Sequence, residues 1–224
     1  MLLGQVIKNW FWDSYDNLGR LIFYNLLWFV LSLPIVTLPA ATAALFYVTN
    51  QMVTQKGLEV KDFFRAFKRY FFKSLLLALI VAAVSFILYQ DFRFFITDRM
   101  GKNWLSFLGA GISFWMIVFW FLMQIYLIPF FVSRNSSVFQ TLKYSALLVL
   151  VNPLRTFFVL LFILVIIVLS VISAAGVVFL MMGLTSIMQH NLLVEVIRKH
   201  SGGDMEGEDR HAYRGWRDII KPWE

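Results

Sequence analysis

Three carboxamide residues inside or at the ends of apolar stretches are the first candidates for chemistry in this chain. Asn25 lies within the run Leu21–Leu33, Asn50 follows a small-residue-rich run, and Gln124 lies within Leu105–Val132. A carboxamide in such a run can line a path for a polar solute, or it can form a hydrogen bond between packed helices. Packing is the favoured interpretation, and a polar lining remains the alternative.

Metal binding and catalysis find little support elsewhere in the chain. Gln189-His190-Asn191, Glu195 and His200 could form one face of a metal site, but a third ligand at helical spacing is missing. The serines have no paired His and Asp and no G-x-S-x-G context. The chain has no cysteine, so thiolate chemistry and disulfides are excluded. We therefore expect no catalytic, metal-binding or cofactor-binding residue, and no enzymatic activity.

The composition is that of a membrane protein. Of the 224 residues, 60% are hydrophobic and 15% are charged, and the mean hydropathy is +0.73. About 20 apolar residues make one helical span, so an all-α, polytopic bundle of about six transmembrane limbs is expected. Residues 1–200 would form this single domain, and residues 201–224 a flexible cytoplasmic tail that is rich in Gly and acidic residues.

The net charge of +7 does not indicate nucleic-acid binding. The basic residues lie in short loops between apolar runs, where the positive-inside rule accounts for them. The expected electrostatic partner is the anionic leaflet of a membrane.

The run Leu21–Leu38 is followed by small residues that resemble a signal-peptide cleavage site. Because about 20 residues with two aspartates precede it, we expect the segment to be retained.

The stretch Glu59–Lys73 predicts an amphipathic helix that lies in the membrane interface. Its aromatic residues fall on one helical arc and its basic residues on the opposite side, with Phe72 as the exception. It runs directly into the apolar segment Ser74–Tyr89, so we expect an elbow, with a corner near Phe72-Lys73, from an interfacial into a transmembrane helix. The predicted interface-anchoring residues are Lys61, Phe64, Arg65, Phe67, Lys68, Arg69, Phe71 and Lys73.

The segment LPIVTLP interrupts the first apolar region. Pro34 and Pro39 each lack an amide N–H and disfavour helix at the preceding residue, so a helix-breaking turn is predicted here. The limbs on either side are short for a full span. They form either a tight hairpin of two short spans or a re-entrant pair inside the bundle. The alanines after Pro39 favour close helix packing.

Three similar corners suggest three units, each with an elbow helix followed by a helical hairpin. The corners are Gly19-Arg20, Phe72-Lys73 and Leu154-Arg155, and the units span residues 5–52, 59–132 and 137–197. The basic residues at these corners place them on one side of the membrane. Under this scheme both termini face the cytoplasm.

Three motifs resemble a known family. They are NLLWFVLSLPIVTLPAATAALFYV at Asn25–Val48, the FFRAFKRYFFKS elbow and the NPLRTF corner. Together they are similar to the YesL-like family, bacterial multi-pass membrane proteins classed as domain of unknown function 624. Leu38 stands where many members have glycine. The resemblance implies location in the bacterial plasma membrane but no established activity.

Members of this family are frequently encoded beside sugar-uptake ABC transporters and glycoside-processing enzymes. The resemblance thus implies an accessory role in carbohydrate or oligosaccharide uptake, with ABC-type transporter subunits as partners. One alternative is a small-solute transporter or channel that uses the proline-broken limbs near Asn25 and Asn50. A membrane scaffold or assembly factor is the other. The oligomeric state is left open by the sequence.

Overall fold

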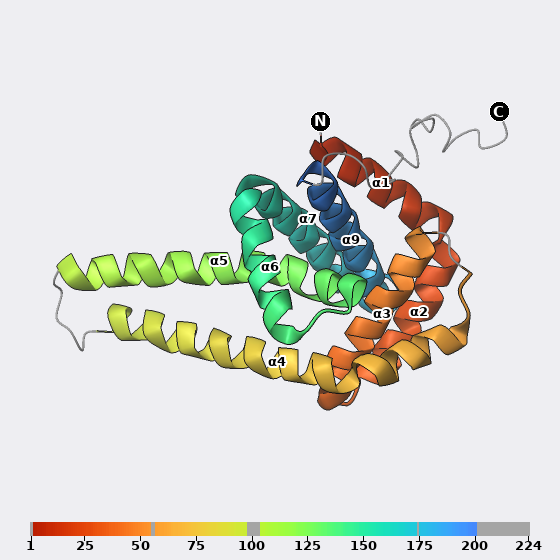
Figure 1. Ribbon diagram of the computed structural model, residues 1–224, viewed down its shortest axis with the longest axis horizontal. Helices are drawn as coiled ribbons and strands as arrows, with labels where there is room; N and C mark the ends of the chain where they lie inside the picture. The colour runs from red at the N-terminus through yellow and green to blue at the C-terminus, as the bar shows by residue number, and fades with distance from the viewer. Residues whose placement is uncertain (1, 55–56, 98–103, 174, 201–224) are drawn as a thin grey trace.

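The computed structural model describes residues 2–54, 57–97, 104–173 and 175–200 (Figure 1). Every regular element within these ranges is helical, which confirms the all-α prediction. The predicted tail at 201–224 lies outside the described residues. In chain order the elements are α1 Leu2–Asp16, α2 Leu18–Ser32, the 3₁₀ helix η1 Ile35–Thr37, α3 Leu38–Val53, α4 Val60–Ile96, α5 Trp104–Arg134, α6 Val138–Val151, α7 Pro153–Ile172, α8 Ala175–Phe179 and α9 Met181–His200.

Helix α3 is the most buried element of the bundle. Eleven of its 16 residues are buried, and they include Ala40, Ala41, Ala43 and Ala44. Alanine lets neighbouring backbones approach closely, and α2, α4 and α9 all pack against α3. The prediction that the alanine-rich limb serves helix packing is confirmed.

Two clusters of buried apolar side chains form the core. The first joins α2 and α3 to the N-terminal half of α4 and to the last turns of α5. The second joins α1, the C-terminal half of α5, α7 and α9. Helix α9 contributes Ile187 to the first cluster and Met188 to the second. It therefore connects the two cores.

Helices α4 and α5 form a long antiparallel hairpin that extends well beyond the rest of the bundle (Figure 1). Both helices are long and apolar enough to cross a membrane, as is α7. Helices α2 and α6 are apolar but shorter. The membrane-helical character is thus supported. Three helices of spanning length are present among the described residues, and the expected count of about six limbs is not confirmed.

The predicted corner at Phe72-Lys73 is wrong. Residues Val60–Ile96 form one continuous α-helix of 37 residues, so the amphipathic stretch and the apolar stretch share one helix. No proline or glycine lies between Val60 and Ile96 to break it. A change from basic to apolar composition was mistaken for a break between two helices.

The other two corners are present. The chain leaves α1 at Asn17 and begins α2 at Leu18, slightly before the predicted position at Gly19-Arg20. Helix α6 ends at Val151, Asn152 caps it, and Pro153 is in the first turn of α7, where its missing N–H costs nothing. The third apolar region is divided by a turn at Leu180, because α8 and α9 are separate helices.

The LPIVTLP segment is a tight reversal between α2 and α3. Pro34 is extended and precedes η1, and Pro39 lies in the first turn of α3. The Thr37 hydroxyl donates to two carbonyls that precede it in the chain, at 2.5 Å to Leu31 O and 2.7 Å to Pro34 O. The turn therefore provides a hydrogen-bond donor for two of its own backbone carbonyls. The side chain of Ile35, at the tip of the turn, is 85% exposed.

Candidate functional site

Asn25 is fully buried and connects α2 to two other helices. Its Nδ2 donates to Val178 O in α8 at 2.8 Å, and its Oδ1 accepts from Gly183 N in α9 at 2.9 Å. Gly183 permits this approach, because a Cβ there would lie 3.1 Å from Leu21 Cδ2. Both polar ends of the carboxamide are used by backbone groups, so its geometry is that of a packing residue.

The other two carboxamides occupy different helices and different surroundings. Gln124 is half-buried in α5, and its Nε2 donates to Trp120 O of the same helix at a long 3.4 Å. Asn50 is half-buried near the end of α3. The hydrogen bonds of Asn25 lead to α8 and α9, whereas that of Gln124 stays within α5. These bonds do not join the three residues into one polar site.

A polar seam along α9 was not recognised from the sequence. Ser186 Oγ donates to Thr49 Oγ1 in α3 at 2.5 Å, and Asn191 Nδ2 donates to Asp13 Oδ2 in α1 at 2.9 Å. Trp10 Nε1 donates to the backbone carbonyl of residue 184 at 2.9 Å. Of these five side chains, all except that of Trp10 are buried. A polar residue every three to four positions along a helix was the available signal.

The candidate metal face is divided among separate contacts. His190 is 6% exposed and lies in the buried part of α9, whereas Glu195 pairs with Arg198 at 2.7 Å. The side chain of His200 lies outside the described residues. Among the residues that the structure does describe, no group of three or more His, Asp or Glu side chains could hold a metal ion.

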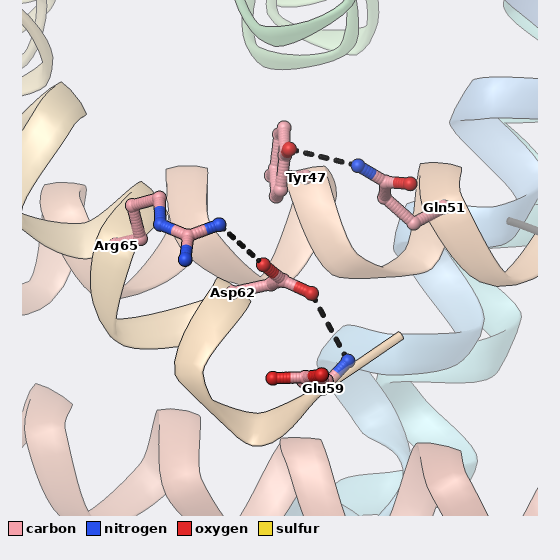
Figure 2. Close-up of polar contacts among 5 residues, drawn as sticks. All are labelled: Tyr47, Gln51, Glu59, Asp62 and Arg65. Carbon is pink, nitrogen blue, oxygen red and sulfur yellow. Dashed lines mark hydrogen bonds and ion pairs between the residues drawn. The ribbon is translucent and has the colours of Figure 1, made fainter. Parts of the chain in front are cut away.

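The start of α4 is fixed by a capping box (Figure 2). Asp62 Oδ2 accepts from the Glu59 backbone N–H at 3.0 Å, and Asp62 Oδ1 accepts from Arg65 Nη1 at 2.8 Å. The same view shows Tyr47 and Gln51 of α3, whose side chains hydrogen-bond at 2.7 Å. The carboxylate of Asp62 also suits the positive N-terminal end of the helix. This end of α4 is thus well defined.

The aromatic arc of α4 divides between the protein core and the exposed surface. Phe63 and Tyr70 are 0% and 2% exposed, and they pack against Tyr24 and Phe131 with ring centroids 6.0 and 5.4 Å apart. The whole arc was expected to face lipid, and for these two residues that expectation is wrong. Tertiary packing competes with the membrane for the same apolar face.

The predicted anchoring residues lie on the remaining faces of α4. Phe64 is 42% exposed, and Phe67 and Phe71 are half-buried. The basic members are all exposed, and they are Lys61, Arg65, Lys68, Arg69 and Lys73. Their accessibility suits contact with an anionic leaflet, which stays a prediction.

An apolar groove lies between α4 and α5. It measures about 680 Å³ and is open to the outside. Leu88 of α4 and Trp115, Met116 and Trp120 of α5 line it. Trp120 Nε1 donates to Ser85 Oγ across the hairpin at 2.9 Å. Its lining is almost purely apolar, so the groove suits hydrocarbon or an apolar helix rather than a sugar or an ion.

Ring and glycine contacts fix the spacing of the hairpin beyond the groove. Gly109 of α5 lies against the ring of Phe95, such that a Cβ at Gly109 would lie 2.4 Å from ring atoms. Gly111 has open space around its Cβ position and lines the groove. Ser113 Oγ donates to Asp91 Oδ2 between the same two helices. The hairpin is therefore a packed pair, with the groove as its open side.

Comparison with known proteins adds one match. No curated protein and no solved structure matches the chain. Residues 21–92, from α2 through most of α4, match the family model described as "Protein of unknown function, DUF624". This segment holds the LPIVTLP turn and the FFRAFKRYFFKS stretch. The match covers 72 of the 224 residues and is consistent with the family that the motifs of the chain indicated.

Proposed function

We propose that the chain is a non-enzymatic, multi-pass membrane protein that acts as an accessory partner of a carbohydrate-uptake system. The α4–α5 hairpin is its docking element, and ABC-type transporter subunits are the expected partners. The family model is described only as of unknown function. The carbohydrate part of the proposal is therefore supported by the family resemblance, and the docking part by the hairpin.

The exposed apolar groove of the hairpin is the observation that carries the proposal. In the most apolar stretch of α4 only 17% of the residues are buried within the protein. Phe86 and Ile87 are 63% and 64% exposed, and Trp115 on α5 is 69% exposed. A bilayer would cover this surface, and a transmembrane helix of a partner could fill the groove, since van der Waals packing drives such association.

Transport by the chain itself is less well supported. That alternative relied on Asn25 and Asn50 as a polar lining. Both ends of the Asn25 carboxamide bind backbone groups of α8 and α9, so Asn25 is not available to a solute. Liposomes that contain the purified protein should show no saturable sugar flux. Saturable flux would favour the transporter.

The proposal includes a topology of about six membrane limbs in a bacterial plasma membrane, with both termini in the cytoplasm. Three helices have spanning length, and the short α2–α3 hairpin and the α8–α9 region supply the rest. The exposed basic residues of the first turns of α4 indicate the cytoplasmic side.

Purification from native membranes in mild detergent tests the docking. Transporter subunits should co-purify with the wild-type chain, and deletion of the chain should reduce saccharide uptake. Met116→Trp would narrow the groove and should reduce co-purification. Phe121→Trp adds the same ring at a position 59% exposed outside the groove and should have no effect. Equal recovery with both variants would exclude the groove as the docking site, and unchanged uptake on deletion would exclude the carbohydrate role.

A further inference from the structure

A second groove lies on the outside of α6, where α6 meets the end of α5 and the end of α9. It measures about 640 Å³. Unlike the groove of the α4–α5 hairpin, it has a polar end and an apolar end. Arg134, Asn135 and Gln140 lie at the first end, and Leu147, Leu148 and Val151 at the second.

The polarity changes gradually along one face of α6. Gln140, Tyr144, Leu147 and Val151 are spaced by four, three and four residues, which places them on one helical face. The face runs for about 16 Å at 1.5 Å per residue. Tyr144 lies between the two ends, with its ring stacked on Phe130 at 5.3 Å. An amphiphile with a polar head and one hydrocarbon chain matches this order of side chains.

The polar end carries positive charge. Arg134 is exposed, and neither ion pair found among the described residues involves it. The groove lining contains no carboxylate within the described part of the chain. The first turn of α6 begins at Val138, next to Asn135, which adopts a left-handed conformation with φ 46°. The N-terminal end of α6 adds a partial positive charge to that of the guanidinium.

We propose that this groove binds one anionic phospholipid. The phosphate lies against the Arg134 guanidinium, whose planar donors suit phosphate oxygens, and one acyl chain lies along Leu147 and Val151 of α6. Helix α6 begins the third predicted unit, 137–197, as its elbow helix, and an elbow helix is expected to lie in the interface, where the head and chain of a lipid separate. The inference does not depend on the accessory role, since it concerns the purified chain and lipid alone.

Native mass spectrometry of the detergent-purified full chain tests the site. Phosphatidylglycerol, phosphatidylcholine and diacylglycerol with identical acyl chains are added separately. We expect one retained phosphatidylglycerol, with about tenfold higher occupancy than diacylglycerol, since a charge-assisted contact to the phosphate contributes on that scale. Phosphatidylcholine, whose phosphate charge is balanced by its own choline, should be retained less than phosphatidylglycerol. Equal retention of phosphatidylglycerol and diacylglycerol would overturn the proposal, because the phosphate would then contribute nothing.

Matched variants locate the binding. Arg134→Gln should abolish the preference for phosphatidylglycerol, and Arg134→Lys should keep most of it. Lys68→Gln removes one exposed positive charge on α4 and should leave the preference unchanged. Leu147→Trp should reduce retention of phosphatidylglycerol to background, whereas Leu150→Trp, 64% exposed and outside the groove, should not. If Lys68→Gln reduced binding as much as Arg134→Gln, the binding would be nonspecific and the site would be wrong.

Discussion

Asn25 accepts a hydrogen bond from the backbone N–H of Gly183 at 2.9 Å, although 158 positions separate the two residues. The same carboxamide donates to Val178 O. The first helical hairpin is thereby attached to the last helices of the bundle through backbone groups at the junction of α8 and α9. The side chain that looked most like a solute ligand is a structural connection between the two ends of the domain.

Replacement of this carboxamide should destabilise the bundle. Asn25→Leu leaves the Gly183 N–H and the Val178 carbonyl without their partner, which should cost about 1–2 kcal/mol. Thermal unfolding in detergent measures the loss. Gln124→Leu is the matched control, because its one hydrogen bond is long and stays within α5. A loss no larger for Asn25→Leu than for Gln124→Leu would contradict the role assigned to Asn25.

Replacement by alanine should have different effects on stability at two nearby glycines of α5. Gly109→Ala places a Cβ 2.4 Å from the Phe95 ring, so the hairpin must shift, at a cost of about 1–3 kcal/mol. Gly111→Ala meets open space and should be neutral or slightly stabilising, since alanine favours helix. Phe95→Ala should remove the penalty of Gly109→Ala. Persistence of the penalty in that double variant would show that the ring contact is not its cause.

The reversal between α2 and α3 can be tested for immersion in the bilayer. At its tip Leu33, Ile35 and Val36 are 69%, 85% and 59% exposed. A turn that lies in water seldom exposes three large apolar side chains. Thr37→Val leaves a turn carbonyl unbonded, and that costs more in hydrocarbon than in water. We expect a loss of about 1–2 kcal/mol in lipid bilayers.

Thr54→Val is the control for this comparison. Thr54 makes the same kind of bond, to Asn50 O at 2.8 Å, at the exposed far end of α3. Water can replace that bond, so the loss should stay below about 0.5 kcal/mol. Equal effects of the two variants would place the tip of the turn in water.

Orientation should depend on the basic face of α4. The chain has no cysteine, so single cysteines report topology without background. Gly57→Cys should react from the cytoplasmic side only, and Trp104→Cys from the opposite side. Changing Lys61, Arg65, Lys68 and Arg69 together to glutamate should disturb insertion or produce mixed labelling of Gly57→Cys. Unchanged labelling in that variant would show that these residues do not set the orientation.

Local features of the fold were predictable where the sequence carries strong signals. The prolines of LPIVTLP and the Asn152-Pro153 corner mark real ends of helices, because proline removes an N–H and restricts its neighbour. The alanines of α3 indicated close packing. These signals act over a few residues, so one sequence suffices to read them.

The errors arose where composition was used to infer direction or surroundings. The change from basic to apolar residues at Lys73 suggested a corner, but nothing near Lys73 breaks the helix. Phe63 and Phe64 are adjacent and of one type, yet they are 0% and 42% exposed. Amphipathicity does not tell a protein core from a lipid surface, because both are apolar. The grooves on α4–α5 and α6 depend on long-range packing, which no local pattern encodes.

Photo-crosslinking from the α4–α5 groove in native membranes tests the central proposal most directly. A photoreactive amino acid replaces Met116, which lines the groove, or Phe121 as a control outside it. We expect crosslinks from position 116 to a membrane subunit of a carbohydrate importer, and none from position 121 to that subunit. Crosslinks from position 116 to lipid alone, or the same protein partners from both positions, would contradict it.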